Sequence, residues 1–289
     1  MSGREHISVL LREVLENLIS NESGVFVDAT VGGAGHALGL LSRNGKLHLI
    51  GFDRDQEALE RAREVLKGYS DRITLLRGNF GDMKSLLHSA GVKSIDGALF
   101  DLGISSYQLA SGRGFSFNDD EELDMRMDRG QDLTAYHIVN SYRQEEIARI
   151  LYEYGEEWQS RRIAKTIFED RKKDRIRTGR QLAEIVASVK KRTGKVHPAT
   201  KTFQALRIAV NDELGSLAKG MDGAIELLSP GSRIGIITFH SLEDRIVKER
   251  FRNDEALTVV TRKPVRPGLD EIRSNPRSRS AKLRIAQKK

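Results

Sequence analysis

The chain has 289 residues, enough for one large domain or two smaller ones. It has no cysteine, which excludes disulfides and thiolate zinc sites, and it has no apolar run long enough to cross a membrane. Its charge is uneven: residues 161–207 carry fifteen Lys or Arg against four Asp or Glu, and residues 245–289 carry fourteen against five. Two basic blocks on an acidic remainder favour a polyanionic partner, RNA or DNA, over solvated helix ends.

The first nineteen residues are typical of an amphipathic helix and lack the apolar core and small-residue cleavage site of a signal peptide. We therefore expect a cytoplasmic protein with no membrane partner. Short apolar runs then alternate with helical periodicity, which predicts a parallel sheet covered by helices. The strands are expected at 24–30, 46–55, 72–80 and 94–103, and the helices at 35–43, 56–68 and 81–91.

The alternation stops after "DLGISSYQLAS", residues 101–111. Residues 109–130 resemble a loop, residues 131–195 look helical, and strand signals resume only at 231–241 and 280–286. The sequence therefore predicts an α/β domain formed by residues 1–108 and 209–289, with an all-helical insertion of residues 109–208. Trp158 is expected in the core of that insertion, and Asn211 is expected either to orient a pocket or to connect the domains.

Polar side chains stand where the four early strands end: Asp28, Asp53, Asn79 with Phe80, and Asp101. The carboxyl ends of parallel strands share one edge, where α/β sheets bind ligands. An aspartate in the first turn suits an ammonium group, and Asp53 can accept hydrogen bonds from ribose hydroxyls. This combination favours S-adenosylmethionine, with Asn79 and Phe80 holding its adenine by a hydrogen bond and by stacking.

The glycine turn after the first strand does not fit a nicotinamide dinucleotide. The G-x-G-x-x-G pattern would start at Gly33 and Gly35, but Leu38 stands where the third glycine belongs. An oxidoreductase is therefore a distant alternative. A second interpretation is that these glycines only permit a tight turn.

Several motifs together point to one family: "DATVGGAGH", "DLGISSYQL", "RGFSF", "LDMRMD", "HPATKTFQALRIAVNDEL", "FHSLEDRIVK" and "NPRSRSAKLR". With them the chain closely resembles the bacterial methyltransferases that methylate the N4 amine of a cytidine in 16S ribosomal RNA. The resemblance extends from His6 to the final strand. It departs from the family at Tyr107, where many relatives have proline, and at Ala34, where others often have glycine.

The resemblance implies a class I, Rossmann-like, S-adenosylmethionine-dependent methyltransferase fold whose helical insertion recognises RNA. It implies 16S rRNA or the small ribosomal subunit as partner, with a decoding-region cytidine as methyl acceptor. The residues expected to bind the donor, from the motifs and the strand ends together, are Asp28, Gly33, Ala34, Gly35, His36, Asp53, Asn79, Phe80, Asp101 and Gln108.

Three residues are candidates for catalysis. The exocyclic amine of cytosine is a poor nucleophile, so that Asp101, or backbone carbonyls of 101–105, would accept a hydrogen bond and later a proton from it. Alternatively Asp101 only binds the methionine end of the donor. Ser105 would contact the base or cap a helix. His240 would face the base or brace the helix that follows it.

Two other functions remain open from the sequence. One is a methyltransferase that acts on DNA or protein, and the other is a noncatalytic RNA-binding protein of ribosome assembly. No cluster of histidine and carboxylate residues has metal-ligand spacing, so that no metal site is expected. A homodimer is compatible with the sequence.

Overall fold

The computed structural model describes residues 7–19, 23–192, 194 and 196–289; the first six residues of the expected N-terminal helix lie outside this range. The chain folds into two compact units. Met1–Gly103 and Leu214–Lys289 form the sheet unit, and Ile104–Glu213 form the helical unit. The boundaries between the units, after Gly103 and before Leu214, each lie five residues from the boundaries expected at 108 and 209.

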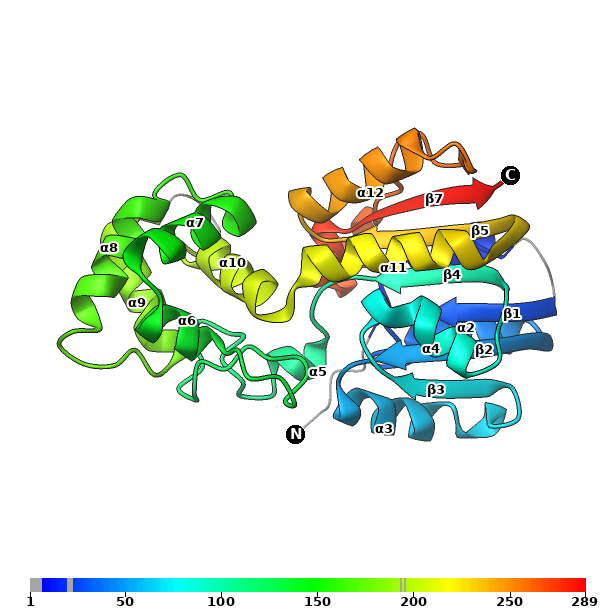
Figure 1. The fold of residues 1–289 in the computed structure, drawn as a ribbon, viewed down its shortest axis with the longest axis horizontal. Coiled ribbons are helices and arrows are strands. Elements are labelled where there is room, and N and C mark those ends of the chain that lie inside the picture. Colours follow the sequence, from blue (N-terminus) through cyan, green and yellow to red (C-terminus); the bar gives the residue numbers. More distant parts are fainter. Residues whose placement is uncertain (1–6, 20–22, 193, 195) are drawn as a thin grey trace. The chain divides into compact units, whose positions relative to one another are not determined.

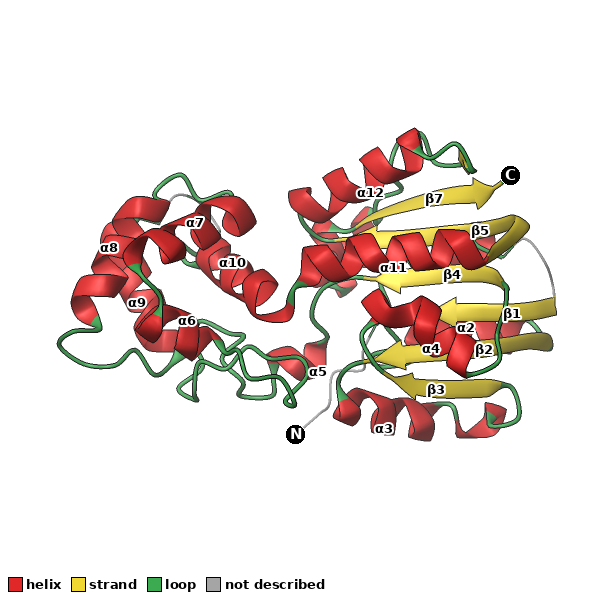
Figure 2. Cartoon of the chain, in the orientation of Figure 1, coloured by secondary structure: helices red, strands yellow, loops and turns green. Residues whose placement is uncertain are grey.

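The sheet unit is built on seven strands (Figures 1 and 2). They are β1 Ser23–Asp28, β2 Lys46–Asp53, β3 Ile73–Arg77, β4 Ile95–Asp101, β5 Leu228–Thr238, β6 Leu257–Val259 and β7 Lys282–Lys288. Their spatial order is β3-β2-β1-β4-β5-β7-β6. The first five are parallel, whereas β7 runs antiparallel to both β5 and β6. This topology confirms the predicted class I α/β fold; the short strand β6 is not predicted by the sequence.

Helices cover both faces of the sheet. They are α1 Leu11–Asn17, α2 Gly35–Arg43, α3 Gln56–Val65, α4 Met83–Ser89, α11 Glu213–Leu227, α12 Ser241–Asn253 and α13 Leu269–Ser274. Apolar residues of α4, α11 and α12, including Met83, Met221 and Phe251, form one buried cluster with the strands. Those of α1, α2 and α3, including Leu40 and Leu59, form a second cluster. The 3.6-residue periodicity of each helix supplies the apolar stripe that these clusters bury.

In the sheet unit, residues 7–10 form hydrogen bonds with residues 271–275, which lie far from them in the sequence. The carbonyl of Val9 lies 2.9 Å from Nε2 of His36. The amide of Leu10 donates to Glu271 Oε1 at 2.9 Å, and Asn275 Nδ2 donates to the carbonyl of Ile7 at 3.1 Å. The segment 7–10 is therefore held against the start of α2 by the C-terminal part of the chain.

The helical unit has a core of its own. Its helices are α5 Ser106–Leu109, α6 Ala135–Ser141, α7 Gln144–Gly155, α8 Ser160–Asp170, α9 Gly179–Val189 and α10 Thr200–Asn211. Ile147, Ile163 and Leu206 are fully buried in one apolar cluster of this unit. Asp212 ends α10 with a left-handed backbone, φ 45°, which separates α10 from α11.

Asn211 clamps the motif "LDMRMD" to α10 inside the helical unit. Its Oδ1 accepts from the Met127 amide at 2.8 Å, and its Nδ2 donates to the carbonyls of Met125 and Arg207 at 2.8 and 2.9 Å. Met125 is buried with φ 60°, a left-handed conformation that is strained for a residue with a side chain. Asn211 therefore stabilises a strained segment of its own unit.

The prediction that Trp158 lies in the core of the helical insertion is wrong. The indole is 81% exposed and does not lie in the core of the helical unit. The acidic neighbour Glu157 is buried in its place, and its Oε2 is ion-paired with Lys190 Nζ at 2.6 Å. Within the described ranges, no helix combines the length and the apolar character needed to cross a membrane.

Candidate active site at the carboxyl edge of the sheet

The turn after β1 brings the strand edge and the start of α2 close together. Gly32 and Ala34 both have left-handed backbones, with φ of 48° and 62°. Gly33 lies between them and is partly exposed. At Gly35 a Cβ atom would overlap the hydroxyl of Ser8, so that any side chain there requires Ser8 to move. Gly32 therefore serves a left-handed turn and Gly35 a close approach to the Ser8 side chain, and Ala34 keeps the left-handed conformation despite its methyl group.

Asp28 ends β1 and is 1% exposed. Its Oδ1 accepts from the Thr30 amide at 3.1 Å. Burial raises the pKa of Asp28 to about 6, and nearby His36 opposes this shift. A buried carboxylate of this kind gains free energy when a cation comes to lie beside it.

Asp53 ends β2 and fastens the glycine turn. Its Oδ2 accepts from the Gly32 amide at 3.0 Å, and its Oδ1 accepts from the Asp55 amide at 2.9 Å. Burial raises the pKa of Asp53 to about 6. Each oxygen uses one backbone donor, which leaves further lone pairs for the two hydroxyls of a ribose.

Asp101 ends β4 and pairs with His36 from the first turn of α2. The distance from Asp101 Oδ2 to His36 Nδ1 is 3.5 Å. The Asp101 amide donates to Thr30 Oγ1 at 2.7 Å, which fixes the strand end against the first turn. Among the described residues, Oδ1 of Asp101 is buried and has no hydrogen-bond partner. Burial and the charge of Glu243 raise the pKa of Asp101 to about 7.

Asn79 and Phe80 stand together after β3, as the sequence predicts, but the amide of Asn79 is engaged at both ends. Its Nδ2 donates to Ser216 Oγ at 2.8 Å, and its Oδ1 accepts from the Gly81 amide at 2.9 Å. The Phe80 ring contacts Phe100 edge to face, with ring centroids 5.5 Å apart. The side chain of Asn79 thus fixes a turn, while its Oδ1 and Nδ2 each keep the capacity for one more hydrogen bond, and Phe80 is partly exposed.

Ser105 and Gln108 belong to the helical unit and bond to each other around α5. The Gln108 amide donates to Ser105 Oγ, and the Ser105 amide donates to Gln108 Oε1, each at 3.1 Å. Gln108 is 6% exposed. The Ser105 hydroxyl therefore caps a helix, which is one of the two roles expected for it.

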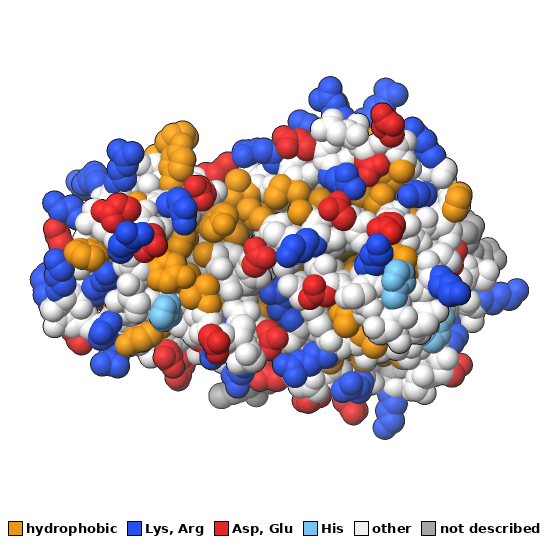
Figure 3. Space-filling view, in the orientation of Figure 1, with side chains coloured by type: hydrophobic (Ala, Val, Ile, Leu, Met, Phe, Trp, Pro, Cys, Tyr) orange, Lys and Arg blue, Asp and Glu red, His pale blue; other side chains and the backbone are white. Residues whose placement is uncertain are grey.

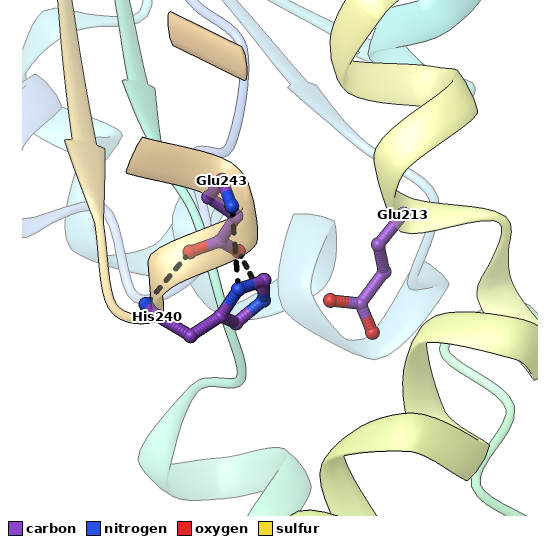
Figure 4. A group of neighbouring side chains, drawn as sticks. All are labelled: Glu213, His240 and Glu243. Atoms are coloured by element: carbon purple, nitrogen blue, oxygen red, sulfur yellow. Dashed lines mark hydrogen bonds and ion pairs between the residues drawn. The ribbon is translucent and has the colours of Figure 1, made fainter. Parts of the chain in front are cut away.

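His240 precedes α12 and braces its first turn (Figure 4). Its Nδ1 accepts from the Glu243 amide at 3.3 Å, and Glu243 Oε2 accepts from the amides of Phe239 and His240 at 2.8 and 3.2 Å. This reciprocal arrangement is a capping box. Glu213, also drawn in the figure, belongs to the helical unit, where Arg207 pairs with it at 2.8 and 2.9 Å.

The structure thus brings Asp28, His36, Asp53 and Asp101 together at one edge of the sheet, and it adds residues that the sequence analysis missed. Thr30 supports the Asp101 amide, and its place in "DAT", two residues after Asp28, is a local signal. Ser216, which holds Asn79, lies 137 residues away and carries no such signal.

The residues of this edge fit S-adenosylmethionine. Three carboxylates with raised pKa values, one of them with an unpartnered buried oxygen, favour a ligand that carries positive charge. The sulfonium and ammonium groups of S-adenosylmethionine supply such charge, and its ribose supplies donors for Asp53. A pyrophosphate would meet Asp28 and be repelled, which argues against a dinucleotide.

Curated relatives resemble the chain over nearly its whole length. It is 49% identical over 290 residues to ribosomal RNA small subunit methyltransferase H of Persephonella marina, with 98% of this chain and 99% of the relative covered. The protein of the same name from a Sulfurihydrogenibium species is 50% identical with the same coverage. That from Brevibacillus brevis is 45% identical over 309 residues, with 98% of each chain covered.

The profile of the MraW methylase family matches residues 3–289. This match and the relatives confirm the predicted resemblance, the predicted methyltransferase activity and S-adenosylmethionine as the methyl donor. With a class I topology, an acidic strand edge and a family match over nearly every residue, the chain belongs to the MraW methylase family.

Proposed function

We propose that the chain transfers a methyl group from S-adenosylmethionine to the N4 amine of a cytidine in the decoding region of 16S rRNA. The substrate is the RNA of the small ribosomal subunit, and the reaction takes place in the cytoplasm. The relatives named as methyltransferases of the small-subunit RNA support this substrate class. The observation that carries the chemistry is Asp101, which ends β4 with a buried, unpartnered oxygen and a pKa of about 7.

The N4 lone pair of cytosine is delocalised into the ring, so that the amine needs both alignment and a proton acceptor. When bound, S-adenosylmethionine supplies an electrophilic methyl carbon whose bond to sulfur breaks as the N4–C bond forms. Alignment of the two atoms contributes much of the acceleration. In this proposal Asp101 accepts a hydrogen bond from N4 and then its proton, because a pKa near 7 suits a general base at neutral pH.

His36 influences the protonation state of Asp101. Its Nε2 faces the Val9 carbonyl, which can only accept, so that Nε2 carries the proton and Nδ1 presents a lone pair to Asp101. Burial also lowers the pKa of His36 and keeps the ring neutral. A neutral ring leaves the Asp101 carboxyl as the group of this pair that exchanges protons near pH 7.

A labelled-methyl assay tests this function. Naked 16S rRNA, assembled small subunits, DNA and protein are offered as substrates, and the product is digested to nucleosides. We expect label only in N4-methylcytidine from 16S rRNA or small subunits. Label in DNA or protein would identify a different substrate, and donor binding without any transfer would favour a noncatalytic assembly protein.

The proposal concerns the single chain. The homodimer that the sequence allows stays a prediction, and sedimentation of the purified protein would measure it.

A further inference from the structure

Two exposed aromatic rings lie together on the helical unit. Trp158 is 81% exposed and Tyr152 is 52% exposed, and their rings meet edge to face with centroids 5.9 Å apart and planes 77° apart. We call Tyr152 and Trp158 the aromatic pair. Because an edge-to-face contact uses the edge of one ring, it holds the pair in place and leaves ring surface open to solvent.

The turn between α7 and α8 is built to keep Trp158 outside. Glu156 ends α7 in a left-handed conformation with φ 48°, and the next residue, Glu157, points into the unit with 2% exposure. Lys190 pairs with Glu157 at 2.6 Å, and the Gln159 amide donates to it at 3.0 Å. An acid inside and a tryptophan outside reverse the usual burial preference. The anchored Glu157 therefore fixes Trp158 on the surface.

Positive charge follows the aromatic pair along the chain. Arg161, Arg162 and Lys165 are exposed on α8, where Lys165 Nζ lies 3.7 Å from Glu169 Oε1. These three cations begin the basic block that covers residues 161–207. The acids that precede the indole are Glu153, Glu156 and the buried Glu157. Figure 3 shows hydrophobic side chains on the surface of the helical unit, surrounded by Lys and Arg with some Asp and Glu among them. Exposed ring faces beside cations match a nucleic acid strand, which presents bases and phosphates in turn.

We propose that the aromatic pair is a stacking site for an unpaired base of the ribosomal RNA, with Arg161, Arg162 and Lys165 holding the adjoining phosphates. This inference rests on the proposed function, since it takes RNA as the substrate. An aromatic content of 6% argues against an extended stacking platform, whereas a site of two rings is compatible with it. The site anchors RNA at a base other than the one that is methylated.

Charge favours RNA over a protein partner at this surface. Arg161 and Arg162 are exposed within four residues of the indole, and they begin the block 161–207, in which fifteen Lys or Arg stand against four Asp or Glu. A phosphate backbone needs such charge, whereas an apolar protein contact does not. Stacking is also tolerant of sequence, because every base has a π face.

Trp158 is the only tryptophan of the chain, so that its fluorescence reports on this site alone. The full-length protein is titrated with a single-stranded fragment of the 16S decoding region and, separately, with inorganic polyphosphate, which has charge but no bases. We expect saturable quenching by the RNA and none by polyphosphate. Unchanged emission while labelled RNA binds, or equal quenching by polyphosphate, would overturn the proposal.

Substitution gives a second readout. Trp158→Ala is expected to raise the KM for naked 16S rRNA about tenfold, with kcat and the KM for the donor unchanged. Trp158→Phe should recover most of the loss, because a phenyl ring still stacks. Leu269→Ala is the matched control, since Leu269 is 73% exposed and lies in the sheet unit. A loss seen with assembled subunits but not with naked RNA would assign the surface to a ribosomal protein and overturn the proposal.

The two readouts separate this inference from the proposed function. If the wild-type protein methylates no RNA cytidine, the proposed function fails, and the quenching titration still decides whether RNA stacks at Trp158. If the wild-type protein methylates RNA and Trp158→Ala behaves as Leu269→Ala does, only the stacking site fails.

Discussion

Nδ1 of His36 lies 3.5 Å from Oδ2 of Asp101, and the other ring nitrogen of His36 faces the carbonyl of Val9. Because Nε2 must donate to that carbonyl, a neutral ring has only a lone pair to offer Asp101. The contact is attractive when one proton lies between the two groups. Burial raises the pKa of Asp101 to about 7 and lowers that of His36, which places this proton on Asp101 in the ligand-free protein.

The first prediction concerns stability. A carboxyl group whose pKa is higher in the folded protein than in the unfolded chain binds its proton more tightly when folded, so that its contribution to stability is lost as pH rises. For Asp101 this stabilisation is lost between about pH 4, the pKa in the unfolded chain, and about pH 7, the pKa in the folded protein. Relative to Asp101→Asn, the wild-type protein should lose on the order of a few kcal/mol of unfolding free energy across this window. Denaturant unfolding at several pH values measures the difference; a constant difference would contradict the raised pKa.

The second prediction concerns donor binding. A cationic donor stabilises ionised carboxylates, so that its binding releases protons from Asp28, Asp53 and Asp101, whose pKa values are about 6, 6 and 7. The affinity for S-adenosylmethionine should therefore rise with pH between 5 and 7, by up to about tenfold per pH unit for each proton released. Calorimetry in buffers of different ionisation enthalpy counts the protons. In Asp101→Asn the affinity for S-adenosylmethionine should rise less steeply near pH 7, because the proton of Asp101 is no longer released.

The third prediction separates the two roles of Asp101. Asp101→Asn keeps the shape of the side chain but cannot accept a proton. If Asp101 is the acceptor for N4, turnover with saturating donor and RNA should fall by about 10²–10⁴-fold. Unchanged turnover with a raised KM for the donor would leave Asp101 only the donor-binding role. Ser89→Ala, an exposed change at the end of α4, is the matched control.

The fourth prediction concerns the spacing of β1 and β4. Gly97 is paired with Phe26 across these strands, and a Cβ atom at Gly97 would overlap the Phe26 ring. Gly97→Ala should lower the unfolding free energy by about 1–3 kcal/mol, because the ring must move within a packed core. Gly45→Ala, where nothing lies within 4 Å of the new methyl group, should leave stability nearly unchanged or slightly raised. Equal effects of the two variants in thermal unfolding would argue against this packing.

The fifth prediction concerns the clamp in the helical unit. Asn211→Ala removes the hydrogen-bond partner of the Met127 amide and that of the Met125 carbonyl. Both of these backbone groups are buried. Leaving such groups unpaired should destabilise the unit by about 2–4 kcal/mol and release the strained backbone of Met125. Hydrogen exchange at residues 123–128 would report the release. Asn253→Ala, on the exposed end of α12, is the control and should change neither stability nor exchange.

The sheet could be predicted because its signals are local. Apolar runs that end in Asp28, Asp53 and Asp101 identify β1, β2 and β4 and the edge they share. The three-residue strand β6 escapes prediction because it is too short to show an alternating pattern and exists through its pairing with β7.

The parts that could not be predicted depend on distant contacts. Trp158 looked like a core residue until Lys190, 33 residues from Glu157, proved to hold the acid inside in its place. The turn held by Asn79 could not be predicted either, because its amide donates to Ser216, 137 residues away. For His240, by contrast, bracing of the following helix was one of the two roles expected from the sequence, and its partner Glu243 lies only three residues later.

The hydrogen bonding of residues 7–10 to residues 271–275 has a consequence for biosynthesis. Leu10 is held by Glu271, which lies 261 positions later, and β7, an interior strand, is formed by Lys282–Lys288. A nascent chain whose residues 271–288 are still in the exit tunnel therefore has neither a complete sheet nor a secured segment 7–10 beside Gly35. The start of α2 thus acquires its neighbours late in synthesis, although its own residues are among the first to be made.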